Sequence, residues 1–305
     1  MTNDSAGPTG PRAYAAAHFA LELDKRTDLG MFRSIEGGSI KADVMTYQNG
    51  GTYDRWRQLG KPKFEDIKLQ VGMAMSAPFY DWIKEFFLGH AVRKDGAIVA
   101  ADFYYKERAR REFTDAMIKE LTFPKLDGSD KNAAYMNVAL SVEDIKFIKG
   151  GGAELKQNAG DTAQKDWKAC NFKFFLGSFD CKNVTKVDSF TIKQNVLEYA
   201  SGGRRSVSKT PSAIDWPQIS FYLPESDAQP LFEHFTNRGV KGEVPGRLNG
   251  HIEMYDNAQK TVFNVAFLNA DILNVQPDKL DATSEEIKQV KVDIYVESMT
   301  FEYKG

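Results

Sequence analysis

Alternating apolar and polar residues recur along the chain and predict half-buried β-strands. The alternation is cleanest near the end of each half, where the apolar residues are Met136, Val138, Leu140 and Val142 in the first half and Val290, Val292, Ile294 and Val296 in the second. Because successive side chains of a strand point to opposite faces, each set lies on one face of a sheet. Shorter alternations predict further strands at residues 18–23, 67–73, 172–176 and 219–223.

A helical period of apolar residues interrupts each half once and predicts one amphipathic helix per half. In residues 76–89 the stripe begins after a Ser76 N-cap with Pro78 in the first turn, and Gly89 ends the helix. In the second half Ser226 or Asp227 can cap a shorter helix that Gly239 ends. We expect both stripes to be packing faces. They comprise Phe79, Trp82, Ile83, Phe86 and Phe87 in the first half and Leu231, Phe232 and Phe235 in the second.

The two halves repeat one another at a nearly constant spacing. KLDGS at residues 125–129 and KLDAT at 279–283 begin 154 residues apart, and the segments that start at Val142 and Val296 have the same spacing. SIKADVMTYQNGG at 39–51 matches TIKQNVLEYASGG at 191–203 with a spacing of 152 residues. Chance rarely preserves such a register over several segments, so the sequence indicates a tandem duplication.

The duplication predicts the domain organisation. We expect a flexible arm at residues 1–13, a first domain at 14–149, a polar linker that begins with glycines at 150–166 and a second domain at 167–305. Each domain should be a mainly antiparallel β-sandwich or barrel of roughly six to eight strands with one flanking α-helix.

Composition limits the classes of function. The 305 residues are 42% hydrophobic and 27% charged, which is typical of a soluble globular protein of about two domains. A net charge of −2 excludes a polycation that binds nucleic acid. The N-terminus lacks the basic start and apolar run of a signal peptide, and no stretch reaches 18 apolar residues. We therefore expect assembly in a cytoplasm and no membrane partner.

The sequence offers no constellation for catalysis. Four histidines and two cysteines, Cys170 and Cys181, show no spacing typical of a metal or nucleophile site, and no motif for phosphate binding is present. We predict no catalytic, metal or cofactor site, and we interpret the cysteines as small buried or half-buried thiols.

Two long basic segments follow Tyr47 and Tyr199, and each is too long for a tight hairpin. Either segment can be a solvated hairpin tip, or a contact arm that reaches an acidic surface on a neighbouring copy. We favour the contact arm. Its basic residues are Arg55, Arg57, Lys61 and Lys63 in the first half and Arg204, Arg205 and Lys209 in the second.

These features together resemble the tail tube protein family of contractile bacteriophages and related injection systems. The resemblance rests on the strand that ends in Tyr47 and two glycines, on RQLGKPKFEDIKLQVG, FYDWIKEFFLG and RKDGAIVAADFYY, and on the closing VALSVEDIKFI. It covers about Tyr14 to Lys149, and more loosely Trp167 to Gly305. The duplication departs from the family, whose typical member is a single such domain.

The resemblance implies a ring-building protein without enzymatic activity or cofactors. In the family each domain gives about four strands to an inner barrel that six domains share, which is about 48 Å across for about 24 strands. The helix packs outside near the subunit boundary, and the long loop reaches the adjacent ring. The basic residues named above would then be contacts between rings. We favour three copies with pseudo-sixfold symmetry over six copies in two stacked rings.

We therefore predict a structural tube protein of a virion tail or injection particle, through which DNA or protein cargo passes. Its partners would be other copies of itself and sheath, baseplate and tail-terminator proteins. One alternative is a baseplate hub or tube initiator with two tube-like domains. An alternative of another class is a monomeric β-barrel that binds a small apolar ligand near Phe103, Tyr104 and Tyr105.

Overall fold

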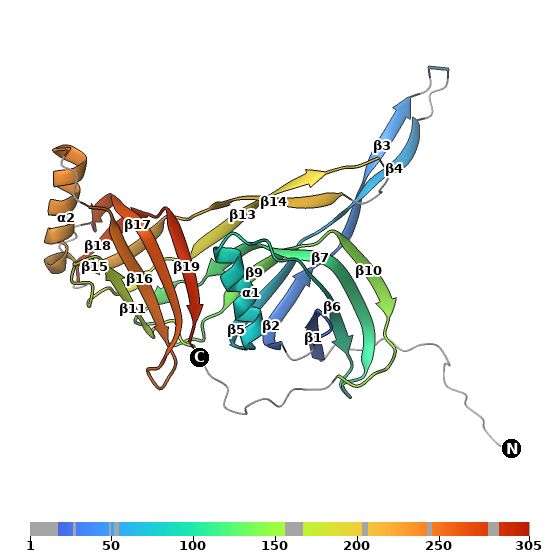
Figure 1. The fold of residues 1–305 in the computed structure, drawn as a ribbon, viewed down its shortest axis with the longest axis horizontal. Coiled ribbons are helices and arrows are strands. Elements are labelled where there is room, and N and C mark those ends of the chain that lie inside the picture. Colours follow the sequence, from blue (N-terminus) through green and yellow to red (C-terminus); the bar gives the residue numbers. More distant parts are fainter. Residues whose placement is uncertain are drawn as a thin grey trace.

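The computed structural model of the chain describes residues 18–26, 29–48, 50–51, 55–155, 167–202, 207–242, 246–279 and 287–304. The first half comprises β1 (His18–Leu23), β2 (Gly30–Gly37), β3 (Ile40–Gln48), β4 (Arg55–Phe64), β5 (Ile67–Met75), α1 (Ala77–Phe87), β6 (Lys94–Ala101), β7 (Glu107–Phe123), β8 (Leu126–Asp127), β9 (Met136–Ser141) and β10 (Asp144–Lys149). The second half comprises β11 (Phe172–Leu176), β12 (Lys186–Val187), β13 (Phe190–Tyr199), β14 (Ser208–Asp215), β15 (Ile219–Pro224), α2 (Gln229–Phe235), β16 (Leu248–Tyr255), β17 (Thr261–Pro277), β18 (Gln289–Tyr295) and β19 (Ser298–Tyr303). The predicted mainly β fold is confirmed, and Figure 1 shows the two halves side by side.

The strands of the two halves follow the same order in space. In the first half the order is β1-β6-β7-β9-β5-β2, with β10 also on β7. In the second half it is β11-β16-β17-β18-β15-β12, with β19 also on β17. These neighbours are antiparallel throughout. The duplicated sequence therefore folds into two copies of one topology.

The strand register is also repeated, down to the irregularities of the long strands β7 and β17. Within its own half, each of these strands pairs with two partners along its first part and with a third along its second part. At the change of partner lie Asp115 and Asn269, 154 residues apart, with left-handed φ angles of 52° and 53°. Asp and Asn tolerate this conformation better than most residues. Such bulges bend a strand, so each long strand passes from one sheet of its half to the other.

Gly96 and its repeat counterpart Gly250 allow a close approach of backbone and ring. A Cβ atom at Gly96 would lie 2.2 Å from the backbone oxygen of Glu22 and 2.6 Å from the ring of Phe113. At Gly250 the corresponding backbone oxygen would also lie at 2.2 Å. Only glycine fits where a neighbouring strand and a core ring come this close.

The helices begin differently in the two halves. Ser76 is the N-cap of α1 as predicted, although its side chain makes no capping hydrogen bond. The N-cap of α2 is Ala228, so the prediction of Ser226 or Asp227 was wrong. Both residues lie in a short 3-10 turn, and the Asp227 carboxylate accepts a hydrogen bond from Asn183 at 2.7 Å instead. Beyond α2 the chain continues as a π turn, Thr236–Val240, which includes the expected terminator Gly239.

The two basic segments are strands, which corrects the prediction of long loops. β4 pairs with β3 and β14 pairs with β13, so each segment is one side of a hairpin. The described residues therefore form ten strands in the first half and nine in the second, more than the roughly six to eight expected. Because the first part of β4 is exposed on both faces, the strand lacks the sustained alternation by which strands are recognised in a sequence.

The structure describes the start of the predicted linker and no residue of the predicted arm. The arm at 1–13 and residues 156–166 of the linker lie outside the described residues. The start of the linker runs alongside the first half and is hydrogen-bonded to it. There the amide of Glu107 donates to the Ala153 oxygen at 2.8 Å, and the amide of Leu155 donates to the Tyr105 oxygen at 2.7 Å.

Candidate assembly interface

The two halves of the chain are joined through their sheets. Residues 190–193 at the start of β13 pair antiparallel with residues 120–123 at the end of β7, and β12 pairs with β8. The pairing places the hydroxyl of Thr191 2.8 Å from that of Thr122 and buries Ile192 completely. We call this contact, together with the two described next, the junction.

Helix α1 of the first half covers the last strand of the second half. The ring of Tyr80 stacks on that of Tyr303 with centroids 4.1 Å apart, and Phe87 stacks on Phe301 at 5.6 Å. Phe301 is only 2% exposed as a result. Tyr80 also donates a hydrogen bond from its hydroxyl to the backbone oxygen of Gly72 at 2.8 Å, which ties the helix to β5. Burial raises the pKa of this hydroxyl far above its ordinary value.

The third contact of the junction anchors the β13–β14 hairpin on the first half. The amide of Lys209 donates to the carboxylate of Glu143 at 2.7 Å, and the Arg93 guanidinium bridges Glu143 and the Lys209 carbonyl oxygen. The Lys209 ammonium donates to the Ser141 hydroxyl at 3.0 Å. Burial lowers the pKa of this ammonium, and the Asp66 carboxylate at 3.8 Å partly offsets the effect. A buried lysine is tolerated here because it has hydrogen-bond partners.

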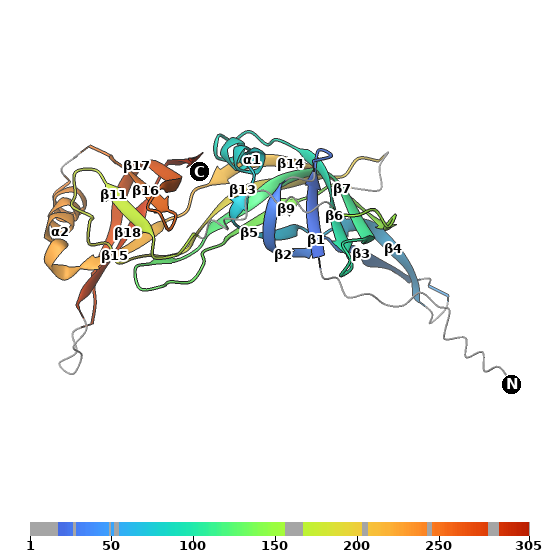
Figure 2. The same cartoon turned by 90° about the horizontal axis from the view of Figure 1, so that it is seen from below.

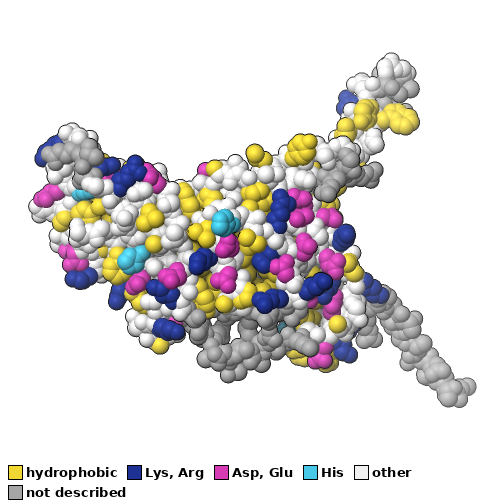
Figure 3. Space-filling view, viewed as in Figure 1, with side chains coloured by type: hydrophobic (Ala, Val, Ile, Leu, Met, Phe, Trp, Pro, Cys, Tyr) yellow, Lys and Arg dark blue, Asp and Glu magenta, His cyan; other side chains and the backbone are white. Residues whose placement is uncertain are grey.

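The β3–β4 hairpin, by contrast, projects away from the body of the chain (Figure 1). Every residue of β3 is exposed, and so are apolar side chains of both strands, among them Val44, Trp56 and Leu59. Figure 3 shows hydrophobic side chains gathered on this projection. An exposed apolar hairpin of this kind is typical of a surface that another protein covers.

The residues predicted for contacts between rings lie in three different settings. Arg55, Arg57, Lys61 and Lys63 are exposed on β4 of the projecting hairpin. Lys209 is buried in the junction and makes a contact within the chain, which sequence reasoning did not anticipate. Arg204 and Arg205 lie outside the described residues.

The predicted helix stripes lie inward, more completely in α1 than in α2. Phe79, Trp82, Ile83, Phe86 and Leu231 are buried, and Phe232 and Phe235 are half-buried.

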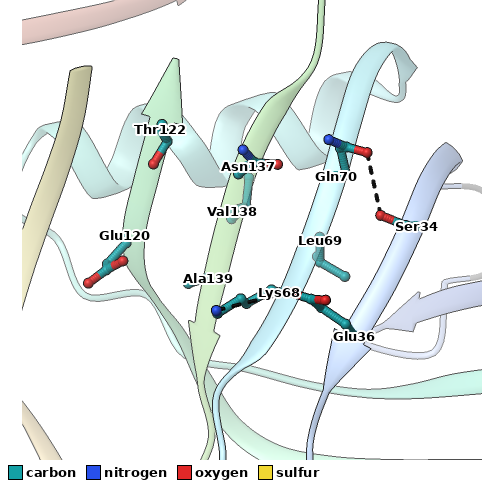
Figure 4. A pocket seen from close by; sticks show the side chains of 10 residues that line it. All are labelled: Ser34, Glu36, Lys68, Leu69, Gln70, Glu120, Thr122, Asn137, Val138 and Ala139. Atoms are coloured by element: carbon teal, nitrogen blue, oxygen red, sulfur yellow. Dashed lines mark hydrogen bonds and ion pairs between the residues drawn. The ribbon is translucent and has the colours of Figure 1, made fainter. Parts of the chain in front are cut away.

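One sheet face is polar and concave, on the side away from α1 (Figure 4). Ser34 and Glu36 of β2, Lys68 and Gln70 of β5, Asn137 of β9 and Glu120 and Thr122 of β7 line a hollow of about 390 Å³ there. The second half continues this polar sheet face through Lys186 and Asp188 near β12 and Lys291 and Asp293 of β18.

Charges on the polar sheet face are balanced in pairs. Each carboxylate has a lysine near it: Glu36–Lys68 at 3.9 Å, Glu120–Lys193 at 3.8 Å, Asp188–Lys186 at 2.9 Å and Asp293–Lys291 at 2.9 Å. Partial burial of Asp293 acts to raise its pKa. Hydrogen bonds from the Ser220 hydroxyl and the Lys291 ammonium act in the opposite direction, and the net result is a lowered pKa. The face therefore presents many charges but little net charge.

The aromatic residues proposed for a ligand-binding barrel lie at the surface. Phe103 and Tyr104 are exposed in the turn between β6 and β7, and Tyr105 stacks on His18 with ring centroids 3.8 Å apart. This arrangement lines no interior and removes the site on which that alternative depended. Within the described part of the chain no group of three or more metal-binding side chains occurs, and none of its helices is long and apolar enough to cross a membrane.

Comparison with known proteins points to one family. The model of the T4-like virus tail tube protein gp19 family matches residues 15–146 and, separately, residues 168–300. No curated protein matches the chain.

Several solved structures resemble one part of the chain. The PVC sheath-tube complex of an extracellular contractile injection system contains a chain that is 17% identical, with 43% of this chain and 89% of that chain covered and a TM-score of 0.36. The anti-feeding prophage baseplate gives 14% identity, 44% and 93% coverage and a TM-score of 0.36. The Hcp1 protein from the E. coli EAEC 042 pathovar gives 15% identity, 44% and 91% coverage and a TM-score of 0.27.

Proposed function

The chain belongs to the T4-like virus tail tube protein gp19 family and carries the family segment twice, and we propose that it builds the stacked rings of a hollow tube. The tube would be part of a phage tail or a phage-like contractile injection particle. The observation that carries this proposal is the junction, because it shows that two copies of the family segment join by sheet pairing. A ring continues this pairing from chain to chain.

The polar sheet face lines the channel of the proposed tube. It lies on the side of the sheet opposite α1, as expected if the helix packs outside the ring (Figure 4). Its paired charges give DNA or an unfolded protein neither a strongly attractive nor a strongly repulsive wall. Cargo would therefore pass without sequence-specific binding.

Each ring would contain three chains with pseudo-sixfold symmetry. The two halves of a chain would then occupy neighbouring positions of one ring rather than separate levels, because β13 extends the sheet of β7 and β8 extends the sheet of β12. Two positions per chain and about six positions per ring, the number that the family resemblance implies, give three chains.

We assign contacts between rings to basic residues of the two basic segments. Arg55, Lys61 and Lys63 are exposed on the projecting hairpin and remain our candidates there, together with Arg204 and Arg205. The sheath, the baseplate and a tail terminator would contact the outside and the two ends of the tube.

Electron microscopy of the purified full-length chain tests the proposal. We expect rings that stack into long tubes with an open centre. Isolated short rings would favour the role of a hub or tube initiator instead. A protein that stays at 34.3 kDa at all concentrations in light scattering would contradict both roles.

A further inference from the structure

Several residues that correspond in the two repeats differ in exposure because the junction covers only one of them. Phe301 is 2% exposed under α1, whereas its counterpart Phe147, at the same register position of β10, is 60% exposed. Ile192 is 0% exposed in β13, whereas its counterpart Ile40 in β3 is 45% exposed. Phe147 and Ile40 therefore lie on surfaces built like one side of the junction, but no partner surface in the described part of the chain covers them.

We propose that a second copy of this chain supplies that other side, and that the junction inside one chain is repeated between chains. The first half of one copy would dock head-to-tail on the second half of the next. Such an interface is heterologous, so it propagates until the ring closes. This inference rests on the proposed ring assembly and assigns its contacts.

The first contact is sheet pairing. Within the chain, residues 190–193 pair with residues 120–123. Their counterparts are residues 38–41 at the start of the projecting hairpin and residues 274–277 at the end of β17. Among the described residues β3 pairs only with β4, and this part of β17 pairs only with β18, so both outer edges are open. Pairing them would set Ser39 opposite Gln276, as Thr191 lies opposite Thr122.

The second contact covers Phe147. Helix α2 corresponds to α1, and Phe232 takes the place of Tyr80, the residue that packs on β19. Phe232 is half-buried and lines a hollow of about 430 Å³ with Glu225, Gln229 and Thr236. The Phe147 ring of the neighbouring copy would pack against Phe232 at this hollow, where apolar burial favours association.

The third contact is an ion pair that occurs in both halves but, among the described residues, binds a backbone segment only in the first. Arg93 and Glu143, which hold the backbone of Lys209, have the counterparts Arg247 and Glu297, and these two also form an ion pair. Arg247 and Glu297 are exposed, whereas Glu143 is buried.

The segment that this exposed pair would bind is on the projecting hairpin. The counterpart of Lys209 by strand register is Arg57, which is exposed on β4. The amide and carbonyl of Arg57 from a neighbouring copy would bind Glu297 and Arg247, as those of Lys209 bind Glu143 and Arg93. Arg57 would then be a contact within a ring rather than between rings.

Disulfide cross-linking tests the predicted register. In a Cys170→Ser background, the pair Ser39→Cys and Gln276→Cys should link chains on oxidation, because opposed residues of an antiparallel pair lie within reach of a disulfide. We expect products of two and three chains and none larger. Thr122→Cys with Thr191→Cys is the positive control and should link within one chain, with the loss of two hydrogen atoms and no product larger than one chain. Thr191→Cys with Gln276→Cys is the negative control, because Thr191 is already paired inside the chain.

The outcome separates this inference from the proposed function. Rings that form while Ser39→Cys and Gln276→Cys stay unlinked, with the positive control linked, would overturn the inference and leave the tube role standing. Absence of rings for the unmodified chain would overturn the proposed function itself.

A surface substitution tests the second contact independently. Phe147→Asp should leave the monomer folded, because the side chain is exposed, and should raise the concentration needed for ring assembly by at least about tenfold. Phe103→Asp is the matched control, since Phe103 is an exposed phenylalanine outside the junction and its counterpart surfaces. Equal assembly of the two variants, with unchanged circular dichroism, would contradict the assigned contact.

Discussion

Corresponding residues of the two repeats have the same backbone conformation even where their side chains differ in chemistry. Asp115 and Asn269 occupy the same left-handed position, and so do Tyr105 and Gln259, with φ angles of 58° and 60°. Gly96 and Gly250 each lie against a backbone oxygen of the neighbouring strand and a phenylalanine ring at corresponding positions. At these positions the backbone geometry of a bend or a close approach restricts the residue type, and both repeats retain it.

Gly96→Ala should destabilise the chain, because its Cβ would lie 2.2 Å from a backbone oxygen that cannot move without shifting β1. Overpacking of this kind lowers the free energy of unfolding by about 1–3 kcal/mol. Thermal or urea unfolding measures the change. Gly151→Ala is the control, since a Cβ there meets no atom within 4 Å. Equal stability of the two variants would contradict the close approach.

Cys181 should resist alkylation in the folded protein. Burial raises the pKa of its thiol to about 11, so almost no thiolate is present at pH 8. The thiolate fraction rises only as the pH approaches that value, provided that the fold persists. Mass spectrometry of a Cys170→Ser variant treated with iodoacetamide should show slow labelling at pH 8 and rapid labelling after unfolding. Rapid labelling of the folded protein would show that the thiol is accessible.

Elements were predictable where one face of a strand or helix meets the core. The alternation of β9 and β18 and the stripe of α1 identified these elements from the sequence, since Val138, Ile294 and Ile83 are all buried. β4 and β14 were misread as loops because neither has a core-facing side long enough to produce alternation. The pairing of β13 with β7 could not be foreseen, because an open sheet edge does not specify its partner in the sequence.

The end of the projecting hairpin, beyond Arg57, should connect rings, whereas its start contacts the next chain of the same ring. Trp56→Glu removes an exposed apolar side chain near the end of the hairpin, so rings should form but tubes should be shorter at the same protein concentration. Negative-stain microscopy measures the length distribution. Tyr104→Glu, at an exposed aromatic residue in the β6–β7 turn, should leave tube length unchanged. Equal shortening by both variants would count against a specific role for the hairpin.

The whole molecule presents one completed junction and two open surfaces that match its two sides. The completed junction joins the halves, while the counterpart surfaces lie at opposite ends of the chain (Figures 1 and 2). A solitary chain would leave Phe147, Ile40 and the β3–β4 hairpin in water. In the proposed ring, the tandem duplication would place half of the contacts inside each chain and leave the other half for assembly.

Cryo-electron microscopy of the rings in cross-section tests the central claim most directly. The account predicts three chains per ring, each 34.3 kDa, arranged as six similar lobes with true threefold symmetry, and β3 of each chain paired with β17 of the next. Rings of six chains with the two halves on separate levels, or rings whose chains meet through other strands, would contradict it.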